Sequence, residues 1–66
     1  ENKYKDALTI FTLNTELYNN AFNTWDSLGE CLLALGKKED GINAYKKSLE
    51  LNPVNENAEI IISDNK

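Results

Sequence analysis

The chain has 66 residues, of which 41% are hydrophobic and 27% are charged, and its formal net charge is −4. A chain of this length forms one small domain, which buries only about 60% of the surface that its unfolded form exposes. The acidic balance argues against DNA, RNA and anionic membranes, because those surfaces attract proteins rich in Lys and Arg. No stretch approaches the roughly 20 consecutive apolar residues of a membrane span. We therefore predict neither nucleic-acid binding nor membrane binding.

The first segment has the apolar spacing of an amphipathic helix. The apolar stripe is formed by residues three, four or seven apart, namely Tyr4, Ala7, Leu8, Phe11 and Tyr18. Ile10 and Leu17 widen this stripe. Asn19 and Asn20 interrupt this pattern, and we predict that Asn20 caps the next helix. The chain begins at Glu1 rather than Met and enters a helical pattern at once, so we expect a piece of a longer protein.

The next two helices are predicted over about Phe22 to Leu35 and about Lys38 to Leu51. The buried side of the first is expected to hold Trp25, Leu28, Leu32 and Leu35, and that of the second Ile42, Tyr45 and Leu49. Gly36 lies where a helix ends with a left-handed residue. Pro53 cannot continue a helix, since it has no backbone donor.

A short fourth helix is predicted after Asn55, which caps it, and is expected to end in Ile60-Ile61-Ile62, with fraying over residues 63–66. No segment has the alternation of a strand. The sequence therefore predicts an all-α fold of about four helices, arranged as antiparallel helix-turn-helix units.

The sequence matches itself when it is moved by one period of about 34 residues. The matched pairs keep small, aromatic and apolar classes: Ala7 with Gly41, Leu8 with Ile42, Phe11 with Tyr45, Glu16 with Glu50, and Leu17 with Leu51. Such a match is typical of stacked repeats, in which neighbouring units build one continuous core.

The stretch from Trp25 to Pro53 resembles a tetratricopeptide repeat (TPR), through Trp25-Asp26-Ser27-Leu28-Gly29, Tyr45 and Pro53. Residues 1–66 are then a single TPR-like domain: residues 1–19 resemble the second helix of a partial repeat, 22–55 a full repeat, and 56–64 a capping helix. The sequence departs from the family pattern at Leu32, Lys38, Gly41, Ser48 and Glu59. Gly41 replaces the usual Ala, and we expect a close helix–helix approach there.

The TPR resemblance implies a scaffold that binds proteins or peptides rather than an enzyme. In that family the first helix of each repeat lines a concave groove, which here would hold Asn23, Asp26, Glu30 and Leu33. Two carboxylates in this groove would repel the C-terminal carboxylate that chaperone-binding relatives hold. A Lys- or Arg-containing peptide is the ligand that an acidic groove would accept, and a solvated face without a ligand is the alternative.

The residues themselves also argue against catalysis and against a cofactor or metal. The chain has no His, so the usual general base and metal ligand are absent. Cys31 is the single cysteine and is interpreted as a small buried residue. The acidic pairs, Glu39 with Asp40 and Asp26 with Glu30, are ordinary on helix surfaces. We predict no catalytic, cofactor-binding or metal-binding residues.

The leading helix lacks its partner, so its side formed by Tyr4, Leu8 and Phe11 is expected to be partly bare, which favours self-association through exposed repeat ends. A second interpretation comes from the sequence segment between Leu13 and Glu30. That segment is similar to C-terminal TPR tails of bacterial serine hydrolases. It implies a structural accessory tail that docks on its own enzyme domain or mediates dimerisation.

Overall fold

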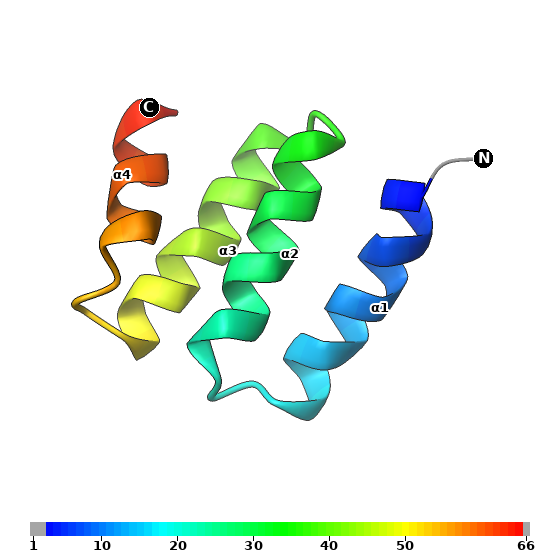
Figure 1. Cartoon of the computed structure of the whole chain (residues 1–66), viewed down its shortest axis with the longest axis horizontal. Coiled ribbons are helices and arrows are strands. Elements are labelled where there is room, and N and C mark those ends of the chain that lie inside the picture. The colour runs from blue at the N-terminus through cyan, green and yellow to red at the C-terminus, as the bar shows by residue number, and fades with distance from the viewer. Residues whose placement is uncertain (1–2, 66) are drawn as a thin grey trace.

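A computed structural model describes residues 3–65 of the chain, and these residues form four α-helices with no strand among them. The helices are α1 (Lys3–Leu17), α2 (Phe22–Ala34), α3 (Lys38–Leu51) and α4 (Glu56–Asp64). Successive helices run in opposite directions and lie side by side in chain order (Figure 1). The predicted all-α class and antiparallel hairpin packing are confirmed.

The turn between α2 and α3 follows the prediction made from Gly36. This residue has a φ of +80°, which is the left-handed region that glycine adopts without a Cβ penalty. The Gly36 amide donates to the carbonyl of Leu33 at 3.0 Å, and the Lys37 amide donates to that of Leu32 at 2.9 Å. These two bonds form a Schellman motif, which satisfies the last carbonyls of α2 and turns the chain into α3.

The core lies between α1, α2 and α3. Leu28, Leu32 and Ala44 are buried together, and Leu8, Phe11 and Trp25 pack against them as half-buried side chains. Tyr45, with only 2% of its surface exposed, is also buried, as the sequence predicted. Burial of such apolar surface is the main favourable contribution to folding.

Helices α2 and α3 approach closely at two glycines. A Cβ atom on Gly41 would lie 2.8 Å from Cδ2 of Leu33, and one on Gly29 would lie 2.7 Å from two ring carbons of Tyr45. Each position would also bring a Cβ within 3.1 Å of the other glycine's carbonyl oxygen. The close approach predicted at Gly41 is therefore confirmed, and Gly29 faces it.

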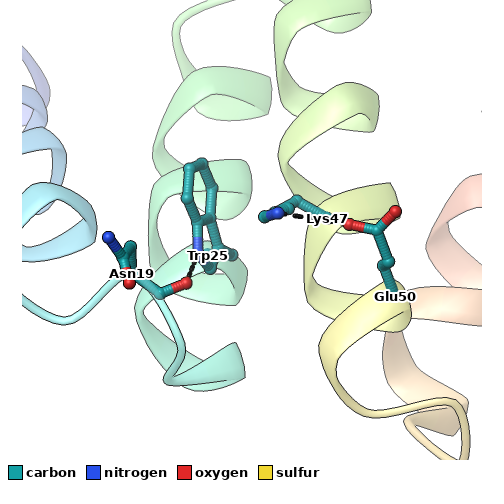
Figure 2. Close-up of polar contacts among 4 residues, drawn as sticks. All are labelled: Asn19, Trp25, Lys47 and Glu50. Atoms are coloured by element: carbon teal, nitrogen blue, oxygen red, sulfur yellow. Dashed lines mark hydrogen bonds and ion pairs between the residues drawn. The ribbon is translucent and has the colours of Figure 1, made fainter.

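The predicted cap at Asn20 is wrong. The residue before α2 is Ala21, which is extended and supplies no side-chain cap. The connection is instead held by Thr24, whose hydroxyl donates to the Ala21 carbonyl at 2.8 Å, and by the indole Nε1 of Trp25, which donates to the Asn19 carbonyl at 3.0 Å. Figure 2 shows the indole on α2 directed at this connection. Trp25 thus combines an apolar contact with a polar one.

The first helix buries fewer of its apolar residues than its sequence stripe suggests. Ile10 has 59% of its surface exposed, and Leu17 and Tyr18 are exposed as well. These side chains project away from the core because the residues that face α2 are Leu8, Phe11 and Thr15. At the other end of the chain, residues 63 and 64 are helical rather than frayed, and Lys66 lies outside the described residues.

Candidate functional site

The four residues predicted to line a groove lie on α2, but they differ in their surroundings. Asn23 and Glu30 are exposed, whereas Asp26 and Leu33 are half-buried. Leu33 extends towards α3, since its Cδ2 occupies the space beside Gly41. Of this predicted set, Asn23 and Glu30 are therefore the most accessible to a partner.

Asp26 is part of a polar network that joins three helices. The side-chain amide nitrogen of Asn55 donates to both carboxylate oxygens of Asp26, at 3.2 and 3.1 Å. The same nitrogen donates to the hydroxyl of Ser48 at 2.9 Å, and the Asn55 side-chain oxygen accepts from the Ala58 amide at 3.3 Å. The predicted cap of α4 is confirmed, and its amide also connects α4 to α2 and α3. The Asp26 carboxylate consequently has partners within the fold.

A groove of about 440 Å³ lies between α1 and α2. Helix α1 contributes Lys3, Tyr4, Ala7 and Phe11 to its lining, and α2 contributes Ser27, Glu30, Cys31 and Ala34. The lining is mostly apolar or small, with one basic and one acidic residue. This groove is a different surface from the predicted acidic one, and it shares only Glu30 with it.

The side of α1 that holds Ala7 and Phe11 is open, as a comparison with α3 shows. One period of about 34 residues separates four positions of α1 from four positions of α3. The α3 positions are all buried: Gly41, Ala44, Tyr45 and Ser48. The matching α1 positions are exposed at Ile10 and half-buried at the other three, namely Ala7, Phe11 and Asn14. We call these four α1 residues the open face of α1.

The difference between these two faces has a clear cause. On α3, Gly41 and Tyr45 lie against Leu33 and Gly29 of α2, and Ala44 is buried with core residues of α2. Ser48 is buried beside Asn55, which donates to its hydroxyl. On α1 no helix precedes the chain's first helix within the described residues, so the matching positions stay accessible. Sequence reasoning placed the bare side at Tyr4, Leu8 and Phe11 and missed Ile10. The match of Ile10 with buried Ala44 is the signal that could have identified it.

Cys31 lies at the base of the groove and is only 2% exposed. Its thiol donates to the backbone carbonyl of Tyr4 at 3.2 Å. Burial, and secondly the charge of Glu30, raise the pKa of this thiol, so the nucleophilic thiolate is disfavoured. The interpretation of Cys31 as a small buried residue is confirmed. Its contact links α2 to the first turn of α1.

Other charged groups form few specific contacts. Lys47 and Glu50 make an ion pair at 3.2 Å on the exposed side of α3 (Figure 2), and such exposed pairs contribute little. Among residues 3–65, no group of three or more His, Cys, Asp or Glu side chains is placed to hold a metal ion. Within the same range no helix is long and apolar enough to cross a membrane.

The chain was compared with protein-family models, with curated proteins and with solved structures, and none of the three comparisons found a match.

Proposed function

We propose that this chain is a TPR-type, non-catalytic module that binds another protein, and that its main contact surface is the open face of α1. The partner element is an amphipathic helix that lies along α1, in the groove between α1 and α2. The single observation that supports this proposal most is the burial of Gly41, Ala44, Tyr45 and Ser48 on α3. There α2 packs against Gly41, Ala44 and Tyr45, whereas the matching α1 residues Ala7, Ile10 and Phe11 are exposed or only half-buried.

The chemistry of the open face favours a helix with small and apolar residues on the contacting side. Ala7 permits a close backbone approach, and Phe11 and Ile10 supply apolar surface that is partly hydrated. Lys3 lies at one end of the groove and Glu30 lines it from α2, so the partner needs an acidic group near the start of α1. An amphipathic helix in an apolar groove is a common mode of peptide recognition.

The accessory-tail interpretation uses the same surface. If the chain is attached to a larger protein, a helix of that protein would cover the open face of α1. A basic peptide on the acidic side of α2 is the competing function, and the exposure of Asn23 and Glu30 favours it. The partial engagement of Asp26 by Asn55 weakens that competitor, because one carboxylate is already bonded within the fold.

Two peptide probes distinguish these functions by nuclear magnetic resonance titration of the isotope-labelled chain. The first probe is a peptide of residues 21–35 carrying Cys31→Ser, which reproduces the helix that covers α3. We expect it to shift the amide resonances of Ala7, Ile10 and Phe11. The second probe is a helical Lys/Ala peptide. Shifts that it causes at Asn23 and Glu30, without any effect of the first probe, would contradict the proposal.

A matched pair of variants on α1 provides the control. Ile10→Glu places a charge on the open face, and burying that charge under a docked helix is costly. Leu13→Glu makes the same kind of change at a position that is 51% exposed and whose α3 counterpart, Lys47, is exposed too. The first probe should lose its effect on Ile10→Glu and keep it on Leu13→Glu. Equal loss in both variants would argue against a defined face.

A further inference from the structure

We infer that the helix bound by the open face of α1 is α4 of a second copy, so that copies of this chain associate head to tail. This inference rests on the proposed function and names the partner. It begins from the two ends of the fold. Helix α1 has the place of α3 in the repeat register and α4 has the place of α2, and within residues 3–65 no helix precedes α1 and none follows α4. In this part of the chain, each end therefore presents a helix of the kind that the other end would pair with.

The close approach of α2 and α3 has a counterpart between α4 and α1. Within the chain, Gly29 of α2 lies against Gly41 and Tyr45 of α3. One period after Gly29 lies Ser63 on α4. One period before Gly41 and Tyr45 lie the open-face residues Ala7 and Phe11 on α1. Ser63 and Ala7 are small, but each carries the Cβ that Gly29 and Gly41 lack, so α4 and α1 would approach less closely than α2 and α3 do. Small residues are thus kept at these positions, at a wider separation of the two helices.

The apolar contacts of the hairpin have counterparts as well. Leu28 of α2 and Ala44 of α3 belong to the buried cluster, and their counterparts are Ile62 on α4 and Ile10 on α1. Ile62 is half-buried and Ile10 is exposed in the single chain. Bringing them together would remove apolar surface from water, which is the usual driving force for association.

A polar contact inside the chain changes to an apolar pair at the ends. Asp26 accepts hydrogen bonds from Asn55 where α2 meets the cap of α4. Asp26 corresponds to Ile60, one period later in the chain, and Asn55 corresponds to Ala21, one period earlier. Ile60 is 57% exposed and Ala21 is half-buried. The pair Asp26 and Asn55 is polar, whereas the corresponding pair Ile60 and Ala21 is apolar at both positions. This is expected if Ile60 contacts Ala21 of another copy.

Charge acts on α4 in two opposite ways: Lys3 at the start of α1 attracts its acidic end, and Glu30, which lines the same groove from α2, repels it. Helix α4 carries Glu56, Glu59 and Asp64 and no basic residue, whereas Lys3 lines the groove at the start of α1. In an antiparallel arrangement the end of α4 that carries Asp64 lies near the start of α1. Glu59 takes the place of Trp25 and supplies no aromatic contact. The interface is therefore expected to be weaker than the α2–α3 hairpin and to require a high protein concentration.

The contact joins two different surfaces, so it is heterologous and can add copies at both ends. Sedimentation equilibrium of the 66-residue chain up to about 1 mM is the first test. We expect the average mass to rise with concentration. Ile10→Glu removes the α1 surface and Ile60→Glu removes the α4 surface, and each should weaken association by about tenfold or more. Leu13→Glu and Val54→Glu are matched controls at exposed apolar positions and should associate like the original chain.

The decisive sample is an equimolar mixture of Ile10→Glu and Ile60→Glu. Each variant retains the surface that the other has lost, so we expect the mixture to form dimers and nothing larger. A mixture that stays monomeric while the original chain associates would overturn the head-to-tail arrangement. So would association that survives in either variant alone. Circular dichroism of each variant confirms that it is folded.

The failure of this inference can be told from the failure of the proposed function. An original chain that stays monomeric at all concentrations, yet still binds the peptide of residues 21–35 on α1, overturns the second copy as partner. It leaves the open face of α1 as a site for another helix. A chain that neither associates nor binds that peptide overturns both proposals.

Discussion

At the scale of single residues, two glycines are required for different physical reasons. Gly36 has a φ of +80° and has no neighbouring atom within 4 Å of where a Cβ would be, so its requirement is conformational. Gly29 lies inside a helix, and a Cβ there would be 2.7 Å from the ring of Tyr45. Glycine is required at this position because α2 packs closely on α3. The role of Gly36 can be predicted from its place at the end of a helical pattern, but the role of Gly29 depends on which residue of α3 faces it.

The packing role of Gly29 leads to a prediction about two alanine variants. Alanine favours a helix by up to ~1 kcal/mol over glycine, but at Gly29 it must displace the buried Tyr45 ring, which we expect to cost about 1–3 kcal/mol. Gly41→Ala should cost less, because the Leu33 side chain that it meets at Cδ2 and Cγ is only half-buried, whereas the Tyr45 ring is buried. Urea unfolding of both variants measures the difference. A larger loss for Gly41→Ala would contradict this account.

The buried thiol predicts how stability responds to alkaline pH. Burial, followed by the charge of Glu30, raises the pKa of Cys31 above its ordinary value near 9.0. The protonated thiol is thus favoured in the folded chain. Its contribution to stability is complete below about pH 9 and is lost as the pH rises through the folded pKa. Tyr45 acts in the same direction, because burial, then Glu30 and Asp26, raise its pKa above 10.0.

Thiolate absorbance in the ultraviolet measures this effect. We expect the folded chain to form the thiolate at higher pH than the urea-unfolded chain does, and we expect Cys31→Ala to reduce the loss of stability between neutral and alkaline pH. Equal titration midpoints for the folded and unfolded chains would show that the thiol is not held in a buried environment.

At the scale of elements, one polar side chain both caps α4 and joins it to the other helices. Asn55 caps the helix through its oxygen and bonds to Asp26 and Ser48 through its nitrogen. The cap could be predicted, because Asn before a helix has this role locally. The links to Asp26 and Ser48 could not, since they depend on how three helices meet. The cap predicted at Asn20 was wrong for another reason: the connection is held by the side chains of Thr24 and Trp25, which come later in the sequence and donate to backbone carbonyls before α2.

Removing this side chain should therefore loosen α4 selectively. We expect Asn55→Ala to lower the free energy of unfolding by about 1–2 kcal/mol, since it deletes a cap and leaves Ser48 without its partner. Asn57→Ala, on the exposed side of the same helix, should change it by less than about 0.5 kcal/mol. Denaturant unfolding gives both values, and amide exchange locates the loss. Faster exchange spread evenly over all four helices would contradict a selective role.

At the scale of the whole molecule, the sequence predicts the elements better than it predicts the surfaces. The 3.6-residue period, Gly36 and Pro53 were sufficient to predict the bounds of α3 as found and those of α2 within one residue. The start of α4 was also predicted as found, whereas the helix continues to Asp64, beyond the predicted end at Ile62. The predicted groove was less successful, because Asp26 and Leu33 take part in contacts with other helices. Ile10 was assigned to the buried stripe, since periodicity identifies an apolar side but not whether another helix covers it.

The central claim is that the uncovered side of α1 and the outer side of α4 are complementary. Intermolecular paramagnetic broadening tests it most directly: a nitroxide is attached to Asn57→Cys, on the exposed side of α4, in a Cys31→Ser background, and this chain is mixed with isotope-labelled chains that carry no nitroxide. Our account predicts broadening of the amides of Ala7, Ile10 and Phe11 in the isotope-labelled chains. Broadening confined to α3 or α4 of those chains, or none at concentrations where the mass increases, would contradict it.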